Sequence, residues 1–185
     1  MDFDKILKKR TSVRRYSSKK VSISDLTAIC EAARFIPVAG NIYTIRLIVV
    51  SDKESKENIA EASLGQDFVK DASFLIVVCS DLTLLKRSYG TKADIYGRQH
   101  AGAAIQNMLL KITELGLGSC WVGAFDENAI KRILKIPDNI QVEAILTLAN
   151  PLNKEEPKKK PDLNTIIYFE KYGQKTAKSE RKPYA

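Results

Sequence analysis

The chain is poor in the residue types that build metal centres and disulfide frameworks. It has 185 residues but one histidine, His100, and three cysteines, Cys30, Cys79 and Cys120, which lie far apart in apolar surroundings. An odd number of separated cysteines fits neither paired disulfides nor a zinc knuckle, and a single histidine cannot complete a catalytic metal site. We therefore interpret the cysteines as core thiols and expect no metal in the chemistry.

The sequence shows no pattern typical of a membrane span or of a signal peptide, and we expect neither. No apolar run approaches the roughly 18 residues that a membrane-spanning helix requires. The first residues, Met1 to Lys5, have neither the cationic start nor the apolar stretch of a signal peptide. Without these features, we expect the protein in the cytoplasm and without a membrane partner. Because no stretch rich in proline, glycine or serine divides the chain in two, we expect one domain over residues 1–185.

The excess of positive charge, +8 at pH 7, raises the alternative of a nucleic-acid partner. Clustered cations gain affinity for phosphate by releasing counterions. Much of the excess lies in residues 158–160 and 171–182, and aromatic residues are not interleaved with these runs as stacking platforms would be. A solvated charged surface is the simpler interpretation, and we expect no nucleic-acid partner.

Hydrophobic periodicity predicts helices and strands along most of the chain. The helices are expected over residues 4–9, 24–36, 53–63, 98–115 and 127–134, and the strands over 46–51, 73–80, 119–124 and 142–149. Ser24 and Asp126 are the expected N-caps of two helices, and Gly116 ends the long one. Strands 46–51 and 73–80 have the continuous apolar composition of buried central strands, whereas polar residues 81–97 have room for one small helix.

The C-terminal part reads as an arm. Residues 151–161 form a lysine-rich linker with three prolines, and residues 165–169 form an isolated apolar strand, followed by a basic tail. A strand needs a partner for its backbone groups. We expect this strand to cross the surface and join a distant sheet edge, either of its own chain or of another subunit.

Two segments have the composition of a ligand site. The first, residues 10–16, offers arginine cations and hydroxyls within five residues, which suits a phosphate dianion. If this segment is extended, Ser12 and Arg14 address one side while Val13 anchors the core. The second, residues 116–123, is a run of small residues whose backbone N–H groups a flat ligand can approach. For the first segment, a solvated basic face after a helix is the alternative.

Other nucleotide motifs are missing. The run from Gly116 to Trp121 leaves a helix to enter a strand and has tryptophan at the third glycine position, so it is no dinucleotide fingerprint. No Walker loop is present either. Residues 37–41, a turn of small residues between a helix and a strand, read either as a simple turn or as exposed backbone for a ligand.

These segments, in their order, resemble the FMN-dependent nitroreductases, of which the chain looks like a minimal member. The resemblance is carried by residues 10–16, 37–41, 65–72, 102–107 and 116–125. It implies an α+β fold with a mainly antiparallel sheet flanked by helices, and a homodimer in which the C-terminal strand is exchanged between the subunits. Two FMN molecules are then expected at the subunit interface, reduced by NADH or NADPH without a Rossmann module.

The resemblance also assigns residues to the cofactor. Near the FMN phosphate and ribityl chain it places Arg10, Thr11 and Ser12, with Arg181 and Lys182 completing the phosphate site, and it places Arg14 and Gln66 at the pyrimidine edge. The loop Pro37, Val38, Ala39, Gly40 and Asn41 packs on the flavin of the other subunit, and the backbone of Trp121, Val122 and Gly123 lies beside the ring.

The implied activity is a ping-pong transfer of hydride from NAD(P)H through the flavin to a nitroaromatic, quinone or similar flat acceptor. The cofactor carries the chemistry, so no catalytic side chain is expected. The alternatives are a non-catalytic flavin- or nucleic-acid-binding module, or a reductive dehalogenase or flavin-fragmenting relative on the same fold. Two departures stand out. Tyr43, Thr44 and Ile45 replace a Gln-Pro-Trp-like segment, and His100 replaces an acidic residue and is expected to make a local hydrogen bond.

Overall fold

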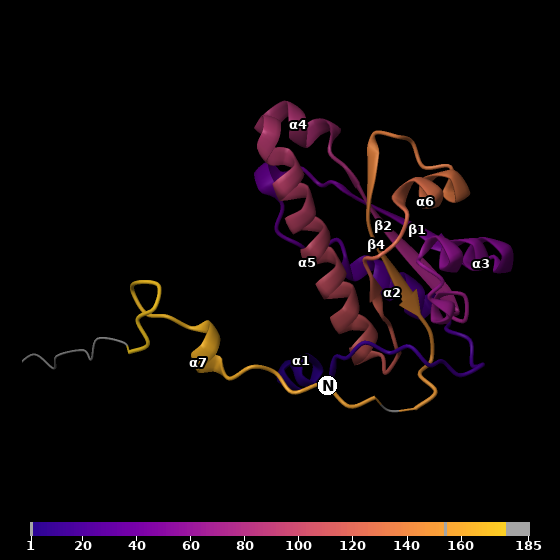
Figure 1. Cartoon of the computed structure of the whole chain (residues 1–185), viewed down its shortest axis with the longest axis horizontal. Helices are drawn as coiled ribbons and strands as arrows, with labels where there is room; N and C mark the ends of the chain where they lie inside the picture. Colours follow the sequence, from indigo (N-terminus) through magenta and orange to yellow (C-terminus); the bar gives the residue numbers. More distant parts are fainter. Residues whose placement is uncertain (1, 154, 177–185) are drawn as a thin grey trace, which may run out of the picture.

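The sheet has four strands, all antiparallel, in the order β1–β2–β4–β3 (Figure 1). This computed structural model describes residues 2–153 and 155–176, so Arg181 and Lys182 lie outside the described residues. The strands are β1 (Ile45–Val50), β2 (Phe74–Asp81), β3 (Trp121–Val122) and β4 (Ile140–Leu148). The expected α+β class and antiparallel sheet are confirmed. The expectation that residues 46–51 form a central strand is wrong: β1 lies at an edge, and its Arg46 and Val49 are exposed.

Two hydrophobic layers cover the two faces of the sheet. In β2, Ile76 and Val78 point into a core shared with helices α2 and α5, whereas Leu75 and Val77 point into a core shared with α3 and α6. This alternation follows from the two-residue period of a strand. Because β2 and β4 are apolar on both faces, they need a helical layer on each side (Figure 1).

The helices are α1 (Phe3–Lys9), α2 (Ile23–Ala32), α3 (Lys53–Ala62), α4 (Thr83–Tyr89), α5 (Ala93–Glu114), α6 (Glu127–Leu134) and α7 (Leu163–Ile166). The small helix for which residues 81–97 have room is α4. The expected cap of the second helix is two residues too late, because Ser22 rather than Ser24 accepts the hydrogen bond from the Asp25 backbone N–H, at 3.0 Å. Ser22 also places Asp25 at the position of a capping box, where the Ser22 hydroxyl donates to it.

The long helix α5 begins five residues before the expected start and ends where expected. Gly97 lies inside it because the residue packs on Leu82 of the preceding turn, and an added Cβ would lie 2.4 Å from a Leu82 methyl carbon. At the other end, Gly116 has a φ of +75°, and the Leu117 N–H donates to the Ile112 carbonyl at 3.0 Å. This is the Schellman arrangement that glycine favours, so the helix ends abruptly there.

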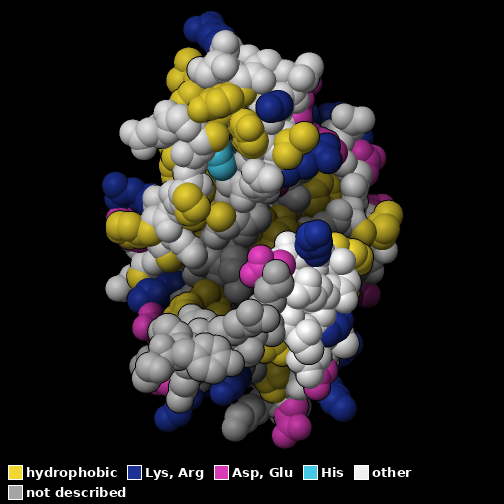
Figure 2. Space-filling model, turned by 90° about the vertical axis from the view of Figure 1, so that its left-hand side faces the viewer, with side chains coloured by type: hydrophobic (Ala, Val, Ile, Leu, Met, Phe, Trp, Pro, Cys, Tyr) yellow, Lys and Arg dark blue, Asp and Glu magenta, His cyan; other side chains and the backbone are white. Residues whose placement is uncertain are grey.

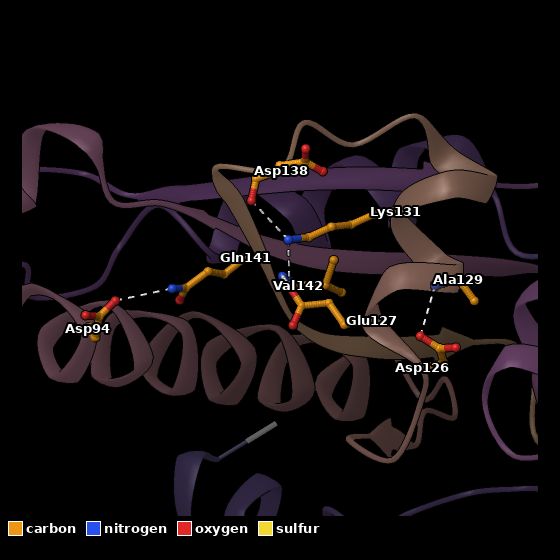
Figure 3. A network of polar contacts seen from close by, with 8 residues as sticks. All are labelled: Asp94, Asp126, Glu127, Ala129, Lys131, Asp138, Gln141 and Val142. Atoms are coloured by element: carbon orange, nitrogen blue, oxygen red, sulfur yellow. Dashed lines mark hydrogen bonds and ion pairs between the residues drawn. The ribbon is translucent and has the colours of Figure 1, made fainter.

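Helix α6 is fastened to β4 by a polar network (Figure 3). Asp126 caps the helix as expected, accepting from the Ala129 N–H at 3.0 Å. Lys131 contacts the Glu127 carboxylate at 3.0 Å and donates to the Asp138 carbonyl at 3.2 Å. Glu127 in turn accepts from the Val142 N–H of β4 at 3.1 Å. One lysine thus ties together the helix, the following loop and the strand.

After β4 the chain leaves the body of the molecule (Figure 1). The strand expected over residues 165–169 is not present in the described part of this arm; a single helical turn, α7, stands there instead. Asp162 begins that turn by accepting from the Asn164 N–H at 3.0 Å. A lone segment has no strand beside it to pair with, and a local turn satisfies part of its backbone. Among the described helices none is both long and apolar enough to span a membrane.

Candidate functional site

Residues 10–14 form an extended segment that leaves α1 and lies along the chain after α5. The Val13 N–H donates to the Ser119 carbonyl at 2.9 Å, and the Val13 side chain is buried as expected. Gly118 permits this approach, since a Cβ there would lie 3.0 Å from a Val13 methyl carbon. The two sequence motifs, about a hundred residues apart in the chain, therefore lie side by side.

Tyr16 fixes this segment to the sheet. Its hydroxyl lies 2.8 Å from the Val13 carbonyl, to which it donates, and 2.6 Å from Thr147 Oγ1 of β4. The same threonine oxygen accepts from the Cys120 N–H at 2.8 Å. Burial raises the pKa of Tyr16 well above its ordinary value. The neutral hydroxyl thus joins both motifs to the centre of the sheet.

The segment opens onto a small cationic cavity of about 140 Å³. Its walls are Arg10, Thr11, Ser12, Arg14, Lys158 and Lys160. All four expected residues of the first motif therefore line one space. Burial raises the pKa of the Cys120 thiol in the second motif, and Arg14 and Ser12 act in the opposite direction.

Lys158 and Lys160 were missed as site residues, because the lysine-rich linker was interpreted as solvated surface. The structure brings both to the cavity, whereas Lys159 between them does not line it. The linker is held near by the Leu152 N–H, which donates to the Arg15 carbonyl at 2.9 Å, and by the Arg15–Glu155 ion pair at 3.9 Å. The two-residue spacing was the available signal, since alternate residues of an extended chain face the same way.

The second motif presents backbone and one aromatic side chain. Trp121 of β3 is 44% exposed, Val122 is buried in the core, and Gly123 is exposed. Within the described chain β3 pairs with β4 alone, so its outer backbone groups are free of strand pairing. Gln66 reaches this place and donates from Nε2 to the Ala124 carbonyl at 3.3 Å and to the Ser63 carbonyl at 2.8 Å. The structure thus brings Gln66 to the end of the motif.

The loop over residues 37–41 lies at the other end of α5. The Ala39 N–H donates to His100 Nε2 at 2.9 Å, and Thr44 Oγ1 lies 3.1 Å from Nδ1 of the same ring. His100 is on the second turn of α5, whereas Thr113 near the C-terminal end lines a cavity beside Thr11. At 1.5 Å per residue, these two helix positions are about 20 Å apart. One chain therefore does not bring the loop to the cationic cavity.

His100 also departs from the expected local hydrogen bond. Its partners are 61 and 56 residues away in the sequence, and the side chain is 4% exposed. Because Nε2 accepts from a backbone N–H, the ring is neutral and carries its proton on Nδ1, which donates to Thr44. Burial lowers the pKa of His100 below its ordinary value of 6.5, consistent with the neutral form.

The cavity cations have no carboxylate partner in the described chain. Among its ion pairs, those of the first segment involve Arg15 alone, while Arg14 lies over the Phe68 ring at 5.7 Å. Four cations and two hydroxyls around a small space attract an anion with several acceptor oxygens. A phosphate monoester has this charge and shape.

Comparison with known sequences identifies the family to which this fold and site belong. A sequence model of the Nitroreductase family matches residues 7–81 and 62–149. A protein of Archaeoglobus fulgidus, provisionally named NADH dehydrogenase/NAD(P)H nitroreductase, is 35% identical over 156 residues, which cover 82% of this chain and 87% of that protein. An FMN reductase [NAD(P)H] of Bacillus subtilis is 25% identical over 182 residues, covering 91% of this chain and 73% of that one.

Solved structures agree with the sequence comparison. A nitroreductase family protein from Clostridium novyi superposes with a TM-score of 0.76 at 28% identity, covering 94% of this chain and 96% of that one. The NADPH:FMN oxidoreductase of Vibrio harveyi in complex with NAD⁺ superposes with a TM-score of 0.85 at 19% identity, covering 93% and 78%. The second likeness concerns the fold alone.

Proposed function

The chain belongs to the nitroreductase family, and from this premise we propose that it is an FMN-dependent oxidoreductase that takes hydride from NADH or NADPH. Bound FMN would accept the hydride at its ring and pass two electrons on to an acceptor. The observation that carries the proposal is the cationic cavity of Arg10, Ser12, Arg14, Lys158 and Lys160, which suits the phosphate of FMN.

The chain's own residues would bind and orient this cofactor. Arg10, Thr11 and Ser12 would hold the phosphate with the two linker lysines, each cation contributing a charge-assisted hydrogen bond. Arg14 would lie near the pyrimidine edge, where a positive charge stabilises the negative charge that develops on reduction. The exposed backbone of Trp121 and Gly123 would flank the ring, next to Gln66.

We propose that the site is completed by a second copy of the chain. In one protomer the loop over residues 37–41 and the cationic cavity lie at opposite ends of α5, so the loop of a partner would have to cover the flavin. A two-fold pairing along α5 would supply both halves twice, as a symmetric homodimer requires.

Exposed apolar side chains support such a pairing. On the face of α1, α2 and α5 they include Phe3 at 60%, Ile23 at 66% and Phe35 at 73% exposed. Phe3 and Phe35 line an open hollow of about 260 Å³ with Ala32 and Leu110. Figure 2, which faces the side that lies on the left in Figure 1, shows apolar side chains spread around a hollow. The arm after residue 154 would add the exposed Leu163 and Ile166 to this interface by packing against the partner.

The acceptor would be a flat molecule such as a quinone or nitroaromatic. No side chain in the cavity has to act as a nucleophile or acid; the cationic walls and the backbone only position the reactants. Since donor and acceptor would use one face of the ring in turn, we expect ping-pong kinetics, with parallel double-reciprocal lines.

The test is a spectrum of the purified, untagged protein followed by titration. We expect absorbance near 450 nm, or its appearance when FMN is added, and bleaching by NADH or NADPH under anaerobic conditions. The variant Arg14→Ala should bind FMN more weakly, while Lys159→Ala, which removes a linker lysine that does not line the cavity, should not. A colourless protein that neither binds FMN nor oxidises either nicotinamide contradicts the proposal.

A further inference from the structure

The loop over residues 37–41 holds an unusual backbone conformation. Gly40 and Asn41 are consecutive residues in the left-handed region, with φ of +58° and +57°. Glycine adopts this region freely and asparagine more easily than most residues. The loop is also partly exposed, from Pro37 to Asn41. Local sequence therefore permits this shape but does not by itself impose it.

Two contacts from outside the loop select that shape. The Tyr89 hydroxyl of α4 occupies the space beside Gly40, where an added Cβ would lie 2.6 Å from its oxygen. His100 of α5 accepts the hydrogen bond of the Ala39 N–H and donates to Thr44 behind the loop. Of these two contacts, the one with His100 is directional and is made to the backbone itself.

We propose that His100 is a positioning residue, whose neutral imidazole holds the Ala39 backbone so that the loop can cover the flavin of the partner subunit, and that protonation of His100 releases the loop and weakens FMN binding. This inference rests on the proposed function. It accounts for a buried, polar residue that the phosphate cavity does not use.

The bond cannot survive protonation. An imidazolium has donors at both nitrogens, so Nε2 would face the Ala39 N–H donor to donor. Burial lowers the pKa of His100, hence the closed loop disfavours the proton. By linkage, the contribution of the bond is complete above pH 6.5, the ordinary value, and decreases as the pH falls through the lowered pKa.

The titratable groups nearest the ring among the described residues are tyrosines and the Asp81 carboxylate. Residues 37–41 contain no charged side chain. Behind Thr44, burial raises the pKa of Tyr43, and bonds from Thr83 lower that of Asp81, which also pairs with Arg46 at 3.5 Å. From α4 and α5 the loop region is packed by the edge-on ring pair Tyr89 and Tyr96. The pKa of His100 is lowered by burial and not by a neighbouring charge.

Two substitutions separate the roles of the ring. His100→Gln keeps an acceptor, Oε1, near the position of Nε2 but cannot be protonated, whereas His100→Leu removes the acceptor. We expect the FMN dissociation constant of the wild type to rise about tenfold more than that of His100→Gln when the pH falls from 7.5 to 5.0. His100→Leu should bind FMN about tenfold more weakly than the wild type at pH 7.5. Its dissociation constant should not show the additional rise at pH 5.0 that we expect of the wild type. The titration of the FMN phosphate is common to all three proteins and cancels in the comparison.

The flavin-free protein provides a second readout. Since the chain has one histidine, its imidazole signals in a proton NMR spectrum of the untagged protein need no assignment. We expect the protection of the Ala39 amide against hydrogen exchange to fall as that signal titrates, and to stay constant in His100→Gln.

The outcomes are distinct. Matching pH profiles of wild type and His100→Gln, or an Ala39 amide whose protection ignores the His100 titration, overturn the positioning role and leave the FMN function intact. A protein that binds no FMN at any pH contradicts the proposed function, and the exchange experiment still decides whether His100 holds the loop. If His100→Leu does not fold, the comparison with His100→Gln decides alone.

Discussion

Lys131 and the cations of the phosphate cavity differ in what surrounds them. Lys131 is 15% exposed in its side chain and is satisfied by the Glu127 carboxylate and the Asp138 carbonyl (Figure 3). Arg10 and Arg14 meet Lys158 and Lys160 around about 140 Å³, with no carboxylate among the residues that line it. Lys131 thus has its partners within the fold, whereas the cavity cations repel one another unless an anion is bound between them.

This difference separates cations that stabilise the fold from cations that bind a ligand. A paired cation contributes to the free energy of unfolding, and its removal leaves unsatisfied groups behind. An unpaired cluster contributes nothing to that free energy, and removing one member relieves repulsion. Substitutions in the two regions should therefore have opposite signatures in stability and in cofactor affinity.

The largest expected effect is in the cavity. Arg10→Ala combined with Lys158→Ala should weaken FMN binding by about 100-fold or more, since each charge-assisted hydrogen bond is worth roughly 1.5–3 kcal/mol. The melting temperature of the flavin-free protein should not fall. The matched control is Lys8→Ala with Lys159→Ala, which removes equal charge from two exposed lysines that do not line the cavity. Equal losses in both double variants, measured by fluorescence titration, would show that net charge alone is responsible.

Tyr16 contributes both to the fold and to the cavity, because it connects the cavity segment to the sheet. Tyr16→Phe removes the hydroxyl that contacts Val13 and Thr147, and we expect a loss of about 1–2 kcal/mol in the free energy of unfolding. FMN binding should weaken severalfold through the displaced segment. Urea denaturation measures the first effect. Tyr43→Phe, which loses one bond to the Ala33 carbonyl, serves as the control and should cost less.

Lys131→Met should give the opposite signature to the cavity variants. It keeps the apolar stem but removes the charge, leaving Glu127 and the Asp138 carbonyl without their partner, so we expect a loss of about 1 kcal/mol in the free energy of unfolding. The affinity for FMN should stay within twofold of the wild type. A Lys131→Met protein of unchanged stability but reduced affinity would contradict the contrast between the two regions.

The smallest effect should come from salt. Raising the ionic strength from 50 to 500 mM shortens the screening length to a few ångströms, so FMN affinity should decrease by about fivefold. The difference in the free energy of unfolding between wild type and Lys131→Met should depend less on salt, because that lysine is largely shielded from solvent. Isothermal titration at several salt concentrations checks the first, and denaturation in the same buffers checks the second.

Much of the fold could be predicted because local rules and tertiary structure agree. Asp126 caps α6, Gly116 ends α5, and Val13 points into the core, as spacing alone indicated. Residues 93–97 belong to α5, although the sequence predicts its start at residue 98; Gly97 lies inside the helix, where it admits Leu82. Whether a glycine ends a helix or admits a neighbour depends on residues distant in the sequence.

The site was predictable in part for the same reason. Residues 10–14 and 116–123 carry their signals locally, and the structure places them side by side. Lys158 and Lys160 look like ordinary linker lysines until the chain folds back onto Arg15. His100 has partners more than 50 residues away, so no local pattern identifies them. The strand expected over residues 165–169 depends on a neighbour outside the single chain, and the exchange between subunits stays a prediction.

The most direct test of the central claim compares FMN with riboflavin, which shares the ring but lacks the phosphate. If the cavity of Arg10, Ser12, Lys158 and Lys160 grips the phosphate, the wild type should bind FMN about 100-fold or more tightly than riboflavin. That preference should largely vanish in the Arg10→Ala, Lys158→Ala double variant, with riboflavin affinity unchanged. Equal affinity of the wild type for the two flavins, or a variant that loses both alike, would contradict the account.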